Sequence, residues 1–302
     1  MIQIIDLQFL GIDRAIAAFL LETTAGPVLF ETGPHSTTNR LRAAIEQYGY
    51  RLEDIKHVFV THIHLDHAGA AWYLAAHGAK VYVHQVGLPH LADPSRLMHS
   101  AKRIYQDQMD YLWGRMEPIA PEQLYAARHG EQFRIGNTTL TAWHTPGHAI
   151  HHIAWQIDEA ALIAGDVAGV RINDNGLPVP PCPPPDINVE DWQQSIQLMK
   201  NLPLTTLYLT HFGAVHDVKN HLAELEKNLL EWANWIYPYW QQQADINAIV
   251  PLFAAFVQQR MVEYGVAATD LSRYEAANPA YMSVAGLMRY WTQKTQREQQ
   301  KN

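Results

Sequence analysis

The chain has 302 residues, of which 48% are hydrophobic, so it is long enough to bury a substantial core. Its formal net charge of -8 disfavours a polyanionic partner, and we expect no nucleic acid among its ligands. Its single cysteine excludes an intramolecular disulfide, and it lacks both a basic secretory start and an apolar run of about 18 residues that could span a bilayer. We therefore expect a cytoplasmic protein that has no membrane partner.

The first 60 residues are predicted to form several strands and one helix. Short apolar runs predict strands at 2–7, 15–22 and 28–30, and a further buried strand at 55–60. Between the last two, residues 38–48 carry apolar side chains at helical spacing and are followed by a glycine. This order indicates antiparallel strands followed by a strand-helix-strand unit.

The stretch 61–69 has the sequence Thr-His-Ile-His-Leu-Asp-His-Ala-Gly and follows directly on the last of these strands. Residues two apart in an extended segment point to the same side, so His62 and His64 can bind one metal ion. Asp66 and His67 lie beyond the bend and face a second position. The stretch therefore predicts a metal site at the end of a strand.

The turn after the strand at 28–30 has the sequence Glu-Thr-Gly-Pro. We interpret Gly33 as a glycine that permits a special backbone conformation close to the metal-binding stretch. Glu31 is expected to orient a metal ligand from behind rather than to act on a substrate.

The chain continues with a predicted helix at 70–76 and a predicted strand at 80–84, and then becomes polar and helical. We interpret residues from about 86 to 130 as a helical insertion that could roof an active site. Four large side chains fit better as its packing face: Met98, Tyr105, Met109 and Trp113. Four histidines lack ligand-like spacing and are expected to be ordinary core or surface residues: His84, His90, His99 and His129.

A hairpin is predicted from two short strand patterns at 132–143 that flank a Gly-Asn turn. It leads through Thr-Pro-Gly to His148, which is placed to complete a ligand triad with the histidines at 62 and 64. His151 and His152 follow closely, and the sequence alone leaves either of them open as a competitor of His148.

Two later strands also end at residues that can bind metal. The apolar run 161–164 leads to Asp166, and the run 204–209 leads to His211. Four strand ends with histidine or aspartate are hard to explain by folding alone, so we expect these side chains to form one site. Between these two runs, residues 171–191 include six prolines and predict an ordered loop that borders the pocket, in which Cys182 is incidental.

Beyond a predicted helix at 191–201, the remainder of the chain has helical patterns. They lie at 221–235, 249–261 and 279–291, and we expect residues 219–302 to form a helical region attached to a domain of residues 1–215. Four aromatic residues could line a groove but fit better as packing between helices: Trp235, Tyr237, Tyr239 and Trp240.

Together these motifs resemble the metallo-β-lactamase-fold superfamily, on its hydroxyacylglutathione hydrolase (glyoxalase II) side, over residues 1 to about 215. The matching motifs are the stretch at 61–69, Thr-Pro-Gly-His, Ala-Gly-Asp and Thr-His-Phe-Gly. The resemblance implies an α/β (α+β) fold, a four-layer αββα sandwich with metals at one edge of its two sheets. It also implies His62, His64 and His148 at one metal, Asp66, His67 and His211 at the other, and Asp166 bridging both.

The same resemblance implies a dinuclear hydrolase. Two divalent ions about 3.5–4 Å apart lower the pKa of a shared water toward 7, and the bridging hydroxide would attack an ester, thioester, lactone or related small acyl substrate. Asp66 is the expected catalytic residue, because it can orient the nucleophile and pass its proton to the leaving group. We expect zinc first, with iron or manganese as alternatives, since imidazole and carboxylate donors suit all three alike. A homodimer is left open.

Two departures limit what the resemblance carries over. Glu31 stands where many relatives have aspartate, and the C-terminal region has dispersed basic residues instead of the cluster that would hold glutathione. Substrate identity therefore does not transfer. The alternatives are a mononuclear iron oxygenase acting on persulfides and a metal-stabilised binding protein. Nuclease and β-lactamase activities are weaker alternatives, because the charge is acidic and a cysteine ligand is absent.

Overall fold

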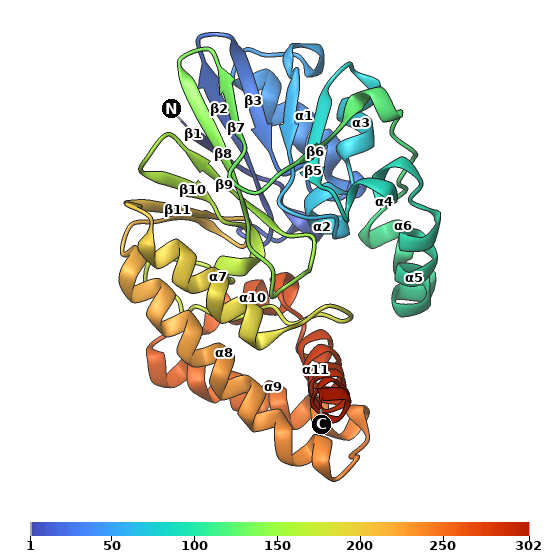
Figure 1. Ribbon diagram of the computed structural model, residues 1–302, viewed down its shortest axis with the longest axis vertical. Coiled ribbons are helices and arrows are strands. Elements are labelled where there is room, and N and C mark those ends of the chain that lie inside the picture. The colour runs from blue at the N-terminus through green and yellow to red at the C-terminus, as the bar shows by residue number, and fades with distance from the viewer. Residues whose placement is uncertain (1, 302) are drawn as a thin grey trace.

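Two six-stranded sheets form the centre of the computed structural model, which describes residues 2–301 (Figure 1). The first sheet contains, in spatial order, β1 (Ile2–Asp6), β2 (Ala17–Thr23), β3 (Gly26–Phe30), β4 (His57–Phe59), β5 (Lys80–His84) and β6 (Leu124–Ala127). The second contains β12 (Gly213–Val215), β11 (Thr206–Leu209), β10 (Ala161–Ile163), β9 (Ile153–Ile157), β8 (Thr138–His144) and β7 (Gln132–Ile135).

Both sheets mix parallel and antiparallel pairs. In the first sheet β1, β2 and β3 are antiparallel, whereas β3 to β6 run parallel. In the second, β7 to β10 are antiparallel, which confirms the predicted hairpin, and β11 joins β10 in parallel. The sequence analysis missed β6 at the end of the predicted insertion, because a four-residue strand with two alanines carries a weak strand signal.

Strands β2, β3 and β5 of the first sheet are buried on both faces along most of their length. Along β2, Phe19 packs against Tyr208 of the second sheet with ring centroids 5.6 Å apart, whereas Leu20 belongs to the core under the outer helices. Phe30 and Leu29 divide in the same way on β3. Burial on both faces explains why these strands appear in the sequence as continuous apolar runs.

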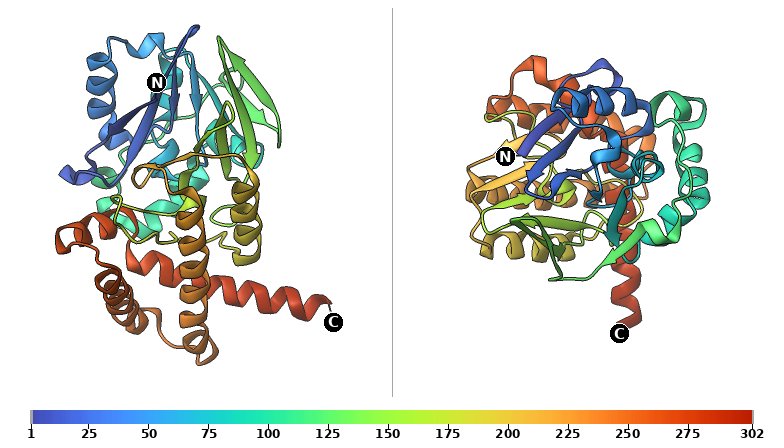
Figure 2. Two further views of the ribbon diagram at one scale, coloured as in Figure 1. Left: turned by 90° about the vertical axis from the view of Figure 1, so that its left-hand side faces the viewer. Right: turned by 90° about the horizontal axis from the view of Figure 1, so that it is seen from above.

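Helices cover the outer face of each sheet (Figures 1 and 2). The first sheet is covered by α1 (Thr38–Gln47) and α3 (Ala71–Ala76), whose Leu41 and Leu74 share a core with Leu29. The second is covered by α7 (Val189–Asn201) and α8 (Val218–Gln241), whose Trp192 and Leu225 share a core with strand residues of β10 and β11. The expected four-layer αββα sandwich is confirmed.

Three further helices follow α8: α9 (Ile246–Tyr264), α10 (Leu271–Ala277) and α11 (Ala280–Lys301). They pack on α8 and extend the same core, and Trp235 packs against Phe253 with ring centroids 5.4 Å apart. The C-terminal helical region is thus confirmed, while its division from the rest of the chain near residues 215–219 stays a prediction. None of the helices within residues 2–301 combines the length and apolar character needed to cross a membrane.

The predicted insertion lies beside β5 and β6 and contains α4 (Leu88–Ala92), α5 (Ser95–Tyr105) and α6 (Met109–Leu112) (Figure 1). Met109 is buried in the core of the first sheet, as expected of a packing face. Tyr105 and Trp113 contact each other with ring centroids 5.1 Å apart, but both are only partly buried.

A buried polar contact holds α8 against the segment that follows β10. The Nε2 of His221 donates to the carbonyl of Ala168 at 2.7 Å, and Nη1 of Arg171 donates to Asp217 at 2.6 Å. Burial lowers the pKa of His221 to about 4, and the charge of Arg171 acts in the same direction, whereas the Ala168 carbonyl and Asp217 oppose it.

We expect His221 to make the free energy of unfolding depend on pH. In an unfolded chain its pKa is about 6.5, so the neutral imidazole favours the folded state above pH 6.5, and this contribution is lost as the pH falls toward 4. The full loss is about 3 kcal/mol. Between pH 7 and pH 4.5, the free energy of unfolding measured in urea should fall less for His221→Gln than for the unchanged protein. His216 is exposed, so His216→Gln should keep the original decline; equal declines in all three proteins would contradict the assignment.

Candidate metal centre

The first group of candidate ligands lies where the chain leaves β4. His62 and His64 follow the strand on an extended segment, and His148 reaches them from the loop after β8. Nε2 of His62 lies 2.8 Å from Nδ1 of His64, and Nε2 of His148 lies 3.1 Å from that same nitrogen. Three ring nitrogens therefore converge on one point, as predicted.

The second group lies beside it. Asp66 and His67 are on the short helix α2 (Leu65–Ala68), and His211 follows β11. Nε2 of His211 is 3.4 Å from Oδ2 of Asp66, and Nε2 of His67 is 3.7 Å from the same oxygen. Asp66 and His67 thus lie on a separate one-turn helix that the sequence analysis did not predict. The helix predicted at 70–76 follows it as α3.

Asp166 joins the two groups. It lies in a single 3-10 turn, Gly165–Ala168, directly after β10. Its Oδ2 is 3.3 Å from Nε2 of His148, while its Oδ1 is 3.2 Å from Nε2 of His67 and 3.4 Å from Nε2 of His211. The structure therefore brings all seven predicted side chains together, and their role as metal ligands stays a prediction.

The geometry of this cluster fits metal binding. Tetrahedral ligands about 2.0–2.1 Å from one ion lie about 3.3 Å from each other, and the separations here run from 2.8 to 3.7 Å. Three buried atoms of this cluster also lack a hydrogen-bond partner among the described residues: Nε2 of His67, Nε2 of His211 and Oδ1 of Asp166. Buried polar atoms are normally paired, and a cation held by the second group would pair all three.

The opposite nitrogens of three rings are held by acceptors. Nδ1 of His67 donates to Glu31 at 2.6 Å, Nδ1 of His148 to the carbonyl of Pro181 at 2.8 Å, and Nδ1 of His211 to the carbonyl of Ala15 at 2.6 Å. The proton on Nδ1 is thereby fixed, so the neutral form of each ring, which is the form that binds metal, presents the lone pair of Nε2 to the cluster.

Glu31 lies behind the second group, as the sequence predicted. It is fully buried in the left-handed backbone region (φ 60°), and its other oxygen accepts a hydrogen bond from the backbone N–H of Thr61 at 2.7 Å. The carboxylate therefore fixes both the His67 ring and the backbone from which His62 follows.

The two groups of candidate ligands differ in the pKa values of their histidines. Burial and the neighbouring His148 lower the pKa of His64 to about 3, so this imidazole is neutral at pH 7. Burial also lowers the pKa of His67, but nearby carboxylates, that of Asp166 first, outweigh it and hold the pKa well above its usual value. Burial raises the pKa of Asp66, yet the imidazoles of His67 and His211 outweigh it and lower the pKa to about 2.

The geometry favours His148 over its two competitors. Nδ1 of His152 contacts the hydroxyl of Thr145 at 2.8 Å, and Nε2 of His151 is 3.8 Å from Asp186. Among the described residues, the groups of converging ligand atoms include His148 and neither of these two.

Gly165 allows the turn that follows β10 to lie close to Thr61 and His152. It has a φ of +51°, and a Cβ there would lie 2.6 Å from Oγ1 of Thr61 and 2.7 Å from Nε2 of His152. A larger residue would therefore push Asp166 away from its neighbours.

A cavity of about 590 Å³ opens beside the cluster, and His64, Asp66 and Asp166 form part of its wall. The other walls come from the insertion, from the prolines at 181–185, and from residues 275–282 at the junction of α10 and α11. The proline-rich loop therefore borders the pocket, as predicted.

The sequence analysis missed several lining residues. Tyr105, assigned to packing, lines this cavity, and burial together with the nearby Tyr281 and Asp66 raises the pKa of its hydroxyl. Trp113 lines it as well. The sequence pattern of a helix shows which of its faces is apolar. It does not show that the apolar faces of two helices far apart in the sequence line the same cavity.

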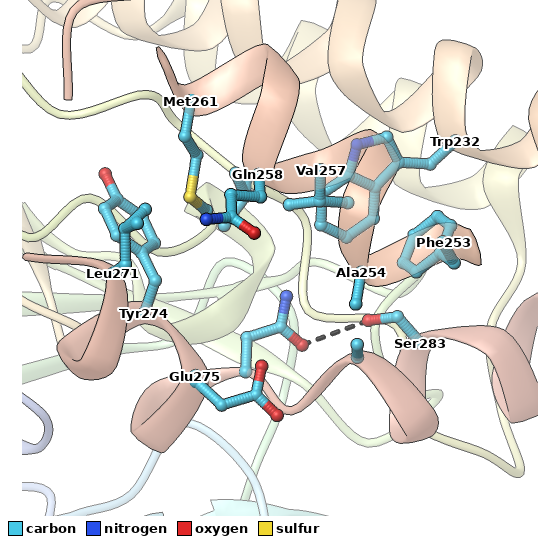
Figure 3. A pocket seen from close by; sticks show the side chains of 13 residues that line it. Trp232, Phe253, Ala254, Val257, Gln258, Met261, Leu271, Tyr274, Glu275 and Ser283 are labelled. Carbon is cyan, nitrogen blue, oxygen red and sulfur yellow. Dashed lines mark hydrogen bonds between the residues drawn. The ribbon is translucent and has the colours of Figure 1, made fainter. Parts of the chain in front are cut away.

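A second cavity of about 190 Å³ lies between α8, α9, α10 and α11 (Figure 3). Trp232, Phe253 and Met261 line it, and the hydroxyl of Ser283 donates to Asn278 at 3.0 Å. None of the seven candidate ligands is in its wall, so it is separate from the metal centre.

Residues 11–211, which include all seven candidate ligands, match the family model described as the metallo-beta-lactamase superfamily. The chain belongs to this superfamily. The predicted superfamily and the predicted class of enzyme, a metal-dependent hydrolase, are confirmed at this level. The matches do not single out the glyoxalase II branch.

Three relatives illustrate the range of the superfamily. The metallo-beta-lactamase fold-containing protein ST1585 of Sulfurisphaera tokodaii is 27% identical over 58% of this chain and 67% of its own length. Thioesterase pkgB of Emericella nidulans is 25% identical over 68% of this chain and 48% of its own length, so the chain spans only about half of it. An N-acyl homoserine lactonase of a Bacillus species is 24% identical over 69% of this chain and 83% of its own length.

A solved structure extends the match to the C-terminal helices. The metallo-beta-lactamase family protein TTHA1429 of Thermus thermophilus has a TM-score of 0.64 at 19% identity, covering 97% of this chain and 94% of its own. At this identity the match shows a common fold only. Because it covers 97% of this chain, it includes the helices α8 to α11.

Proposed function

We propose that the chain is a dinuclear metal-dependent hydrolase that cleaves an ester, thioester, lactone or related small acyl compound. The observation that carries this proposal is the position of Asp166 between two groups of converging ligand atoms on the wall of a cavity. The thioesterase and lactonase among the relatives support an acyl substrate.

In this proposal each group holds one ion. The first would be held by His62, His64 and His148, the second by Asp66, His67 and His211, with Asp166 shared. Two bound divalent ions would supply a hydroxide at neutral pH and polarise the carbonyl under attack. We expect zinc in both positions, although imidazole and carboxylate donors suit iron and manganese as well.

The protein itself supplies orientation and proton transfer. The Asp66 side chain is 21% exposed against 5% for Asp166, so Asp66 is the ligand carboxylate that a substrate reaches more easily. It can hold the proton taken from the nucleophile and pass it to the leaving oxygen or sulfur. Water is thereby added across the acyl bond, giving a carboxylic acid and an alcohol or thiol.

The motifs that resemble glyoxalase II do not lead us to propose glutathione compounds as substrates. Arg96 is the one lysine or arginine among the described residues of the cavity wall. A wall with one guanidinium offers little to the carboxylates of a charged tripeptide.

The test combines metal analysis with a substrate panel. We expect about two metal ions per chain and cleavage of at least one compound among p-nitrophenyl esters, acyl thioesters and lactones. Fully loaded protein that cleaves none of them would refute the proposal. One iron per chain with oxygen consumption on a persulfide would favour the oxygenase instead.

A further inference from the structure

We propose that the substrate carries a long apolar acyl chain, which lies between the insertion and the beginning of α11. This inference rests on the proposed hydrolase function and adds the substrate class to it. The acyl carbonyl would lie at the metal centre, and the chain would extend away from it along the cavity.

The size and position of the cavity support this arrangement. Its volume of about 590 Å³ lies within the range of about 300–1,000 Å³ typical of pockets for drug-sized ligands. It is continuous with Asp66 and Asp166, so a ligand that fills it reaches the proposed reacting centre. Away from that end, aliphatic and aromatic side chains predominate in the wall.

Exposed apolar side chains concentrate at this cavity. Of the 13 large apolar residues that are exposed within the described chain, five are in its wall: Leu10, Val86, Ile104, Ile150 and Tyr281. Apolar surface grouped around a pocket marks a binding site, because a ligand that covers it removes that surface from water. The occupant that suits this wall is itself apolar.

Tyr105 and Tyr281 lie on opposite sides of the cavity. Tyr105 is on α5 and Tyr281 on α11, and both are in its wall together with Asp66. The insertion and the C-terminal helices therefore border the space next to the metal centre from two sides. A flexible chain that starts at the centre can extend along this wall, of which Ile104 is also a part.

The first experiment measures chain-length preference with the metal-loaded full chain. The substrates are p-nitrophenyl esters and N-acetylcysteamine thioesters with acyl groups of two to ten carbons. We expect kcat/KM to rise about two- to fourfold per added methylene until the cavity is filled, since each buried methylene contributes a nearly constant factor. A profile that is flat or falls with length would overturn the inference.

A matched pair of surface variants locates the effect. Ile104 is 45% exposed and lines the cavity, whereas Leu252 is 51% exposed on α9 and does not line it. Ile104→Ser should lower the ratio of decanoyl to acetyl kcat/KM at least about threefold, because it removes part of the apolar wall. Leu252→Ser should leave this ratio unchanged. Ser100→Phe, which adds bulk to the same wall, should move the preferred acyl length downward.

A binding measurement on the metal-loaded full chain is independent of turnover when the probe is a free acid, because the probe has no acyl bond to cleave. A dansyl-labelled undecanoic acid should gain fluorescence on binding, decanoate should displace it, and acetate should not. Ile104→Ser should weaken the binding of this probe, and Leu252→Ser should not. Acyl cleavage without length preference and without probe binding would refute the inference but leave the hydrolase proposal standing. Protein that cleaves no acyl compound would remove both.

Discussion

Replacing Asp166 with alanine is expected to lower kcat/KM by at least about a thousandfold and to reduce the bound metal. The reason is geometric, because the two oxygens of Asp166 lie 3.2–3.4 Å from Nε2 of His67, His148 and His211. Loss of a group behind a ligand costs about 10–100-fold, and a shared ligand should cost more. Metal analysis of the purified variant and steady-state kinetics on the best acyl substrate measure both effects.

Asp107→Ala is the matched control, since Asp107 is an exposed aspartate of the insertion outside the cavity wall. It should keep the metal content and the turnover of the unchanged protein. Circular dichroism should show that the Asp166 variant is folded, because its contacts lie at the end of the sheets rather than within their cores. An Asp166→Ala protein that retains its metal and turns over normally would show that Asp166 does not join the two groups.

Glu31→Gln should weaken metal binding by about 10–100-fold and destabilise the protein by about 1–3 kcal/mol. The carboxylate accepts hydrogen bonds from both the Thr61 N–H and Nδ1 of His67, and it is fully buried. An amide can accept through only one end. The variant therefore either leaves the Thr61 N–H unpaired or turns its NH₂ group toward His67, which moves the ring proton to Nε2 and blocks coordination.

Glu31→Asp preserves the charge with a shorter reach, so it should fall between Glu31→Gln and the unchanged protein. Glu22→Gln, at an exposed position of β2, should change neither property. The measurements are metal titration by calorimetry and urea unfolding. Equal metal affinity in the Glu31→Gln variant and the unchanged protein would contradict the orienting role.

The site could be predicted well from the sequence because its chemistry is concentrated at strand ends. His62, His64, Asp66 and His67 come from one nine-residue stretch, and the sheets bring the other three candidate ligands to the same edge. The residues alone left His148, His151 and His152 open, since closely spaced histidines in a loop differ only in where their rings point. The resemblance implied His148, and the structure brings the ring of this histidine to the other candidate ligands.

The cavity could not be predicted from the sequence, because tertiary contacts create it. The pattern of α5 indicates an amphipathic helix, but only the fold places Tyr105 beside Tyr281, 176 positions later in the numbering. The short elements β6, β12 and α10 were missed for a related reason. Three to seven residues carry too little periodicity, and neighbouring strands and helices stabilise them instead.

The walls of the large cavity also imply an order of assembly during synthesis. Every candidate ligand precedes residue 212, whereas one wall comes from residues 275–282. In a chain synthesised from its N-terminus, all seven candidate ligands therefore emerge before the residues of this wall. The part of the cavity farthest along the chain is completed last, after the strands that carry the candidate ligands.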